Sequence, residues 1–164
     1  MRDLKPLQFE TIRTVDDRIL REFFYLALFV PPGEAPLPKS IIDEPVLVKY
    51  IENFGEKEGD LAVTAKDKKI LGLVWGRKFR ADKKGWGYVD DKTPEIGISV
   101  LPDYRNIGIG TVLLKQIFQA YRDIGIQAVS LSVDKRNPSL RLYEQTGFKI
   151  IGEEDNAFIG LKQL

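Results

Sequence analysis

A glycine-rich loop is the part of the sequence whose residue types point most directly to a ligand. It covers residues 105–110, reads Arg-Asn-Ile-Gly-Ile-Gly, and follows a strand-like segment at residues 95–100. An amphipathic segment typical of a helix begins at Gly110. Glycine lets the backbone approach a ligand closely, and the free N–H groups at the start of a helix attract an anion. The loop therefore predicts a binding site for a ligand that carries phosphate groups.

Two common phosphate-binding loops do not fit these residues. A P-loop ends in Gly-Lys-Ser/Thr, whereas Gly110 is followed by Thr111 and Val112. A dinucleotide-binding fingerprint needs a third glycine or alanine where Leu113 stands, and no acidic residue ends a following strand in register. The pattern that fits is Val-x-Pro-x-x-Arg-x-x-Gly-x-Gly, over residues 100–110.

A second motif lies at residues 137–148 and reads Asn-Pro-Ser-Leu-Arg-Leu-Tyr-Glu-Gln-Thr-Gly-Phe. The pattern at residues 100–110 resembles the acetyl-CoA motif of the GNAT N-acetyltransferase superfamily. The second motif is similar to the segment of that superfamily that begins with asparagine and ends in Leu-Tyr-x-x-x-Gly-Phe. The resemblance implies an α/β (α+β) fold with a mixed, largely antiparallel sheet flanked by helices. It also implies one domain over residues 1–164 and acetyl-CoA as the cosubstrate.

By this resemblance, the strand at residues 95–100 and the glycine loop bind acetyl-CoA. Ile98 and Val100 would bond the pantetheine arm and the thioester through main-chain groups, and Arg105 would lie beside the pyrophosphate. Asn137 would bond the cofactor arm, although it is equally suited to cap a helix. Gly97 within the strand marks either a bulge or a close ligand. The predicted binding set is Ile98, Ser99, Val100, Arg105, Asn106, Ile107, Gly108, Ile109, Gly110, Thr111, Asn137 and Tyr143.

The resemblance also implies two catalytic side chains. Family members with tyrosine at the position of Tyr143 use its hydroxyl to protonate the departing thiolate, while a core aromatic is the alternative for this residue. Glu95 stands where many members keep a base, often acting through water, and an exposed strand-end carboxylate is the alternative. Asp90 and Asp91 in the preceding loop could instead form an acidic rim that attracts a cationic acceptor.

The composition excludes several other kinds of chemistry. Cysteine and histidine are both absent, so thiolate nucleophiles, imidazole metal sites and a Ser-His-Asp triad are excluded, and no metal is predicted. The formal net charge is +1, which predicts neither a nucleic-acid nor a membrane partner. No signal-like segment opens the sequence and the apolar run at residues 23–30 is too short to span a bilayer, so we expect a cytoplasmic protein. A monomer and a homodimer both stay open.

The elements that would position these residues can be predicted from periodicity and breakers. Thr14 is the expected N-cap of the first helix, and Val112 is expected among the core residues of the helix after the glycine loop. Gly147 should end the short helix that follows Asn137 and Pro138. The predicted order is strand 7–12, helix 14–29, proline-rich arm 31–38, helix 45–53, strands 61–66 and 69–78, loop 81–93, strand 95–100, helix to Asp123, strand 128–133, helix 137–146, and a hairpin of 148–153 with 157–164.

The function that these features predict is direct transfer of acetyl from acetyl-CoA to a primary amine. A small amine, an amino acid and a protein amine all stay open as acceptors. Trp75, Arg77, Trp86 and Tyr88 would suit an amphipathic acceptor pocket, although buried aromatics of a sheet explain them equally well. A CoA-binding module without catalysis, acting as a sensor or interaction module, is the alternative from another class.

Overall fold

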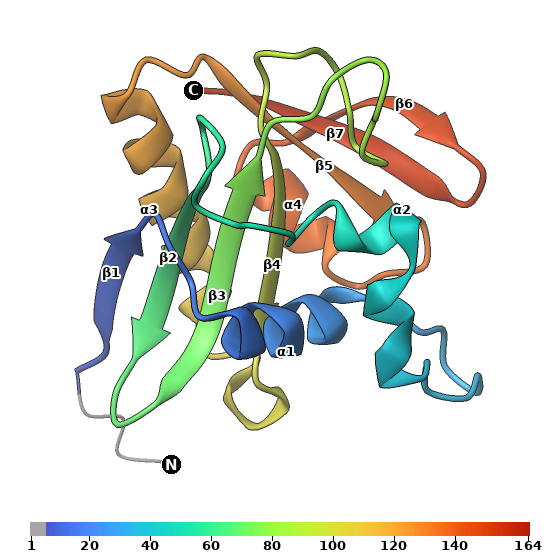
Figure 1. Ribbon diagram of the computed structural model, residues 1–164. Coiled ribbons are helices and arrows are strands. Elements are labelled where there is room, and N and C mark those ends of the chain that lie inside the picture. The colour runs from blue at the N-terminus through green and yellow to red at the C-terminus, as the bar shows by residue number, and fades with distance from the viewer. Residues whose placement is uncertain (1–5) are drawn as a thin grey trace.

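The computed structural model describes residues 6–164, and within this range seven strands form one sheet with helices on both faces (Figure 1). The strand order is β1-β2-β3-β4-β5-β7-β6, and each neighbouring pair is antiparallel except β4 with β5. The mixed, largely antiparallel sheet is thereby confirmed. The elements are β1 Gln8–Ile12, α1 Asp17–Ala27, η1 Lys39–Asp43, α2 Pro45–Val48, β2 Leu61–Lys66, β3 Ile70–Arg77, β4 Glu95–Val100, η2 Pro102–Tyr104, α3 Ile109–Asp123, β5 Ala128–Asp134, α4 Leu140–Gln145, β6 Lys149–Glu154 and β7 Ala157–Gln163.

The N-cap of helix α1 lies two residues later than predicted. The carboxylate of Asp16, and not the hydroxyl of Thr14, accepts hydrogen bonds from the first-turn N–H groups of Arg18 and Ile19. An ionised carboxylate is the stronger acceptor and also complements the positive end of the helix dipole. The helix buries Phe23 and Phe24 against the face of the sheet that lies toward the viewer in Figure 1.

Helix α3 packs on the opposite face of the sheet with a different stripe of side chains from the one predicted. Leu113 and Ile117 are fully buried as expected, but Val112 is 37% exposed. Leu114 and Tyr121 complete the buried face instead. The reason is that the stripe runs through positions i, i+4 and i+8 from Ile109, which turns Val112 toward the flank of the helix.

Strands β4 and β5 diverge immediately after they meet. Their register contains one pair, Glu95 with Ser130, supported by a hydrogen bond from the Ser130 N–H to the Pro94 carbonyl at 2.9 Å. On its other edge β4 pairs with β3 without a register shift, so Gly97 does not mark a bulge in that pairing. A Cβ at Gly97 would lie 2.6 Å from the Trp75 ring, so the glycine makes room for that ring.

A buried ion pair fixes the segment between α2 and β2. The Arg77 guanidinium contacts the Asp60 carboxylate at 2.8 Å, and the two side chains are 1% and 0% exposed. Arg77 also donates to the carbonyl oxygens of Lys49 and Glu52, at 3.0 and 2.7 Å. Arg77 therefore has a structural role, and its predicted place in an acceptor pocket is wrong.

The helix predicted for residues 45–53 is shorter, because α2 ends at Val48 and turns follow it to residue 55. Gly147 ends α4 as predicted, with a φ of 105°. Among residues 6–164, no helix has the length and apolar content that crossing a bilayer requires.

Candidate active site

Two cavities meet where β4 separates from β5. The first, called here the Glu95 cavity, has a volume of about 490 Å³ and lies between α1, β4 and β5. The second, called the α3 cavity, has a volume of about 710 Å³ and follows β4 to the start of α3 and α4. Ile98, Asn137 and Tyr143 line both, so the cavities adjoin at these residues.

The α3 cavity contains the glycine loop. Gly108 caps α3 in a left-handed conformation with φ 94° and no side-chain hydrogen bond, and Asn106 is also left-handed. A Cβ added at Gly108 would meet no atom within 4 Å, so the loop is open on that side. Uncapped first-turn N–H groups and the positive end of a 15-residue helix favour a negatively charged ligand here.

The structure brings nearly all of the predicted binding residues together. All of the predicted binding set except Ile107 line the α3 cavity, and the Ile107 side chain is 50% exposed. The Ser99 hydroxyl donates a hydrogen bond to the Phe23 carbonyl at 2.6 Å. Ser99 can therefore contact a ligand only through its main-chain groups. Asn137 is not the N-cap of α4, which begins later with Ser139 as its cap; the Asn137 Oδ1 accepts from the Ser139 N–H at 2.9 Å and fixes the turn before the helix.

Glu95 lies at the floor of the other cavity and is 5% exposed, so the exposed strand-end alternative is wrong. Its Oε1 accepts a hydrogen bond from the Gly87 N–H. Its Oε2 is buried and makes no hydrogen bond of normal geometry with any described residue, although the Tyr50 hydroxyl lies close enough to act on this carboxyl group. Burial raises the pKa of the Glu95 carboxyl to about 7, against the opposing effects of the Tyr50 hydroxyl and the Gly87 N–H.

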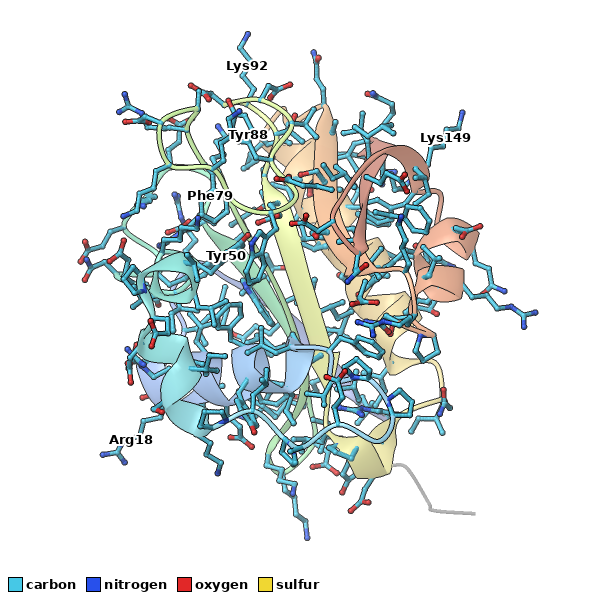
Figure 2. All side chains as sticks on the ribbon, turned by 90° about the vertical axis from the view of Figure 1, so that its right-hand side faces the viewer. Arg18, Tyr50, Phe79, Tyr88, Lys92 and Lys149 are labelled. Carbon is cyan, nitrogen blue, oxygen red and sulfur yellow. The ribbon has the colours of Figure 1, made fainter. Side chains whose placement is uncertain are left out.

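Tyr50 is a site residue that sequence reasoning missed. Its hydroxyl accepts a hydrogen bond from the Trp86 N–H at 2.6 Å, which ties the 81–94 loop to the end of α2. Its ring packs against Phe79 with centroids 4.8 Å apart, and Figure 2 shows these two rings beneath the loop that carries Tyr88. Burial raises the pKa of the Tyr50 hydroxyl, so it stays protonated beside Glu95.

Tyr143 stands at the junction of the two cavities. Its ring packs edge-on against Phe148 at 6.0 Å, which fixes the direction of the hydroxyl. Burial raises the pKa of this hydroxyl to about 12, so it carries its proton at neutral pH. Tyr143 is therefore both a packed aromatic and a hydroxyl that borders the cavities.

The acidic rim predicted from Asp90 and Asp91 lies outside both cavities. Asp90 accepts from the N–H groups of Lys92 and Thr93, and Asp91 accepts from the Ala81 N–H and the Tyr88 hydroxyl. These carboxylates shape the 81–94 loop. Tyr88 likewise lines neither cavity, whereas Trp75 and Trp86 both line the Glu95 cavity.

The fold and the glycine loop beside the cavities can now be set against known families. Residues 21–148 match the acetyltransferase (GNAT) family. This range is more than half of the sequence, so the chain belongs to the GNAT acetyltransferase family. The implied family membership is confirmed.

Relatives with assigned names are N-acetyltransferases or acetyltransferases. An N-alpha-acetyltransferase of Sulfurisphaera tokodaii is 29% identical over 110 residues, which are 61% of this chain and 62% of that protein. A mycothiol acetyltransferase of Thermomonospora curvata is 36% identical over 89 residues, which are 54% of this chain and 27% of that protein. The match thus spans less than two thirds of either relative.

Solved structures show the same fold at low identity. The GNAT domain of S. lividans PAT has a TM-score of 0.70 and 17% identity, with 96% of this chain and 90% of that chain covered. The PaiA N-acetyltransferase of Thermoplasma acidophilum in complex with coenzyme A has a TM-score of 0.66 and 16% identity, with coverage of 96% and 99%.

Proposed function

We propose that the chain transfers an acetyl group from acetyl-CoA directly to a primary amine. The observation that supports this most is the junction of the two cavities at Ile98, Asn137 and Tyr143. One cavity begins at an uncapped helix start suited to phosphates, and the other ends at a buried carboxylate. A donor and an acceptor bound in these two places would meet beside Tyr143.

The α3 cavity fits the donor. The N–H groups at Gly108, Ile109 and Gly110 would bind the pyrophosphate, with Arg105 beside it. The Arg105 Nε donates to the Val100 carbonyl at 2.9 Å, which fixes the side chain along the cavity. Main-chain groups on the free edge of β4, at Ile98 and Val100, would hold the pantetheine arm. Acetyl-CoA supplies the activated thioester carbonyl when bound.

The Glu95 cavity fits the acceptor. An ammonium group must lose a proton before its nitrogen can attack, and Glu95 would accept that proton directly or through water. With a pKa of about 7, a substantial fraction of Glu95 is ionised at neutral pH. The nitrogen attacks the thioester carbonyl, the C–S bond then breaks, and Tyr143 would give its proton to the departing sulfur. The second proton lost by the nitrogen would restore the Tyr143 hydroxyl, directly or through water. The proposal includes no metal ion.

The test is release of free CoA from acetyl-CoA in the presence of a panel of primary amines. We expect acceptor-dependent release in the wild type and a matching acetylated amine by mass spectrometry. The alternative, a CoA-binding module without catalysis, predicts stabilisation of the fold by acetyl-CoA but no acceptor-dependent release. Release at the same rate with and without amine would contradict acetyl transfer.

A further inference from the structure

The walls of the Glu95 cavity are largely apolar and aromatic. Side chains from α1, the proline-rich arm, α2, β3 and the 81–94 loop form them, namely Phe24, Leu28, Leu37, Leu47, Trp75 and Trp86. Trp75 is 2% exposed and fixed by its edge-on contact with Phe24 at 6.0 Å, whereas Trp86 is 51% exposed at the cavity wall. Such walls favour an apolar body over a polar one.

The charged residues that line this cavity are all acidic. They are Glu95, Asp134, Glu154 and Asp155, and no lysine or arginine lines it within residues 6–164. Glu154 and Asp155 form no ion pair with any described residue. The cavity therefore attracts a cation and offers no partner to an anion.

Two cations near the acidic lining residues are engaged by other groups. Arg136 donates to both oxygens of Asp134, at 3.0 and 2.9 Å, and this contact holds the pKa of Asp134 at about 2. Lys49, whose charge acts on Glu95, donates to the Lys84 carbonyl at 2.5 Å and lies over the Tyr50 ring. Neither cation is positioned to bind a carboxylate inside the cavity.

We propose that the acceptor is a small primary amine on an apolar aryl or alkyl skeleton, with no carboxylate or phosphate near the amine. This inference rests on the proposed acetyl transfer and specifies its acceptor. The amine would lie at the Glu95 end of the cavity, with its proton reaching the buried carboxyl group through water, and the skeleton would pack against the aromatic walls. A volume of about 490 Å³ is within the usual range for pockets that enclose a small ligand.

Three acceptors that share one skeleton test the charge argument. Phenethylamine and L-phenylalaninamide carry no negative charge, whereas L-phenylalanine adds a carboxylate beside the same amine. We expect the two acceptors without a carboxylate to have a kcat/KM about 10²-fold or more above that of L-phenylalanine, because a buried carboxylate without a partner is strongly disfavoured. L-phenylalanine acetylated as efficiently as phenethylamine would overturn the proposal. So would rejection of both phenylalanine compounds alike, which would indicate size and not charge.

A peptide that begins with phenylalanine distinguishes a free amine from a protein N-terminus, because it has an uncharged amide where L-phenylalanine has its carboxylate. Acetylation of this peptide together with rejection of phenethylamine would overturn the small-amine proposal. We expect phenethylamine to be the better acceptor of the two.

Binding can be measured apart from chemistry because both tryptophans of the chain line this cavity. Tryptophan fluorescence excited at a wavelength that phenyl rings do not absorb should change on titration with phenethylamine and not with L-phenylalanine. Fluorescence changes with phenethylamine but no CoA release would contradict acetyl transfer alone. Equal binding of L-phenylalanine would contradict the acceptor class alone.

A charge introduced into the cavity wall gives a gain-of-function test. Leu37 lines the cavity from the proline-rich arm, where its carbonyl is bonded by the Tyr25 hydroxyl. Leu37→Arg should reduce the preference for phenethylamine over L-phenylalanine by about tenfold or more, because it supplies a partner for the carboxylate. Ala35→Arg adds the same charge at an exposed position outside the cavity and should leave the preference unchanged. An equal effect of both variants would overturn the assignment of this cavity to the acceptor.

Discussion

The two oxygens of the Glu95 carboxyl group have different surroundings. Oε1 is fixed by the Gly87 N–H, and Oε2 is buried near the Tyr50 hydroxyl without a hydrogen bond of normal geometry to any described residue. The Gly-Trp-Gly sequence at residues 85–87 explains how a carboxyl group fits there. A Cβ at Gly85 would lie 2.4 Å from Oε2, and one at Gly87 would lie 2.5 Å from Oε1. The loop thus needs both glycines to close over Glu95.

Glu95→Gln removes the base and keeps the shape of the side chain. At pH 7 we expect acetyl-CoA affinity to survive and amine transfer to fall by about 10²-fold or more. The pH profile of kcat/KM should contain an ionisation near pH 7 in the wild type, since the pKa of Glu95 is about 7, and lack it in the variant. As pH rises further the variant should recover, because more of the acceptor is already neutral amine. Matching profiles would mean that another group or bulk water takes the proton.

The raised pKa of Glu95 also has a consequence for stability. The value rises from an ordinary 4.5 to about 7 on folding, so the folded protein holds this proton more tightly than the unfolded chain does. The stabilising effect is complete below about pH 4.5 and is lost as pH rises through 7, by about 3 kcal/mol in total. Urea denaturation should show this loss in the wild type and not in Glu95→Gln. Parallel curves for the two proteins would contradict the raised pKa.

Tyr143→Phe should separate packing from chemistry, because only the hydroxyl is removed from a ring held by Phe148. We expect CoA affinity to stay near the wild-type value and turnover to fall by about 10²-fold or less. The measurement is single-turnover acetyl transfer, in which the chemical step limits the rate. Wild-type turnover in this variant would show that Tyr143 has a packing role alone.

Helix α3 offers a prediction at the scale of the element, because a glycine with positive φ flanks each end of it. Gly108 at the start and Gly125 after the end have φ values of 94° and 83°, and a Cβ at either would meet no atom within 4 Å. Valine at each position should therefore cost about 1–3 kcal/mol of stability through backbone strain. Gly108→Val should also abolish most of the thermal shift caused by acetyl-CoA, while Gly125→Val should keep it. Equal thermal shifts in both variants would show that the start of α3 is not part of the acetyl-CoA binding site.

Several elements could be predicted from the sequence because their signals are local. The bounds of β2 and β4 agree with the predicted residues 61–66 and 95–100, where breakers flank short apolar runs. The start of α1 was predicted at the wrong cap, since Thr14 and Asp16 are both good caps and only the folded geometry decides between them. Val112 shows the same limit of sequence-based prediction for a helix face. Several apolar residues of α3 could face the sheet, and only the packing of the helix on the sheet decides which of them is buried.

At the scale of the whole molecule, the site depends on contacts that no local pattern contains. Tyr50 and Trp86 are 36 positions apart in sequence, yet their hydrogen bond joins the end of α2 to the loop over Glu95. The glycine loop could be predicted because it is one continuous motif. The Glu95 cavity could not, since its walls come from segments that are far apart in sequence and meet only in the folded chain.

The Arg77–Asp60 pair holds the segment between α2 and β2 in place. Arg77→Met leaves the buried Asp60 carboxylate without its cation, so we expect the free energy of unfolding to fall by about 3–5 kcal/mol in urea denaturation. Lys78→Met is a neighbouring control, because Lys78 pairs with Glu58, which is 92% exposed, and should cost about 1 kcal/mol or less. Similar losses in both variants would show that the pair contributes no more than a surface contact.

The shared wall of the two cavities has a consequence for how ligands affect each other. Ile98, Asn137 and Tyr143 face both cavities, so a molecule in either one orders side chains that the other molecule also contacts. Thermodynamic reciprocity then requires that any gain in affinity on one side appears as an equal gain on the other. With positive coupling, the donor would bind the protein–acceptor complex more tightly than the free protein. The acceptor would likewise bind the protein–donor complex more tightly than the free protein. An analogue long enough to cross Tyr143 would gain from both sites at once, because its second half binds at a high effective concentration.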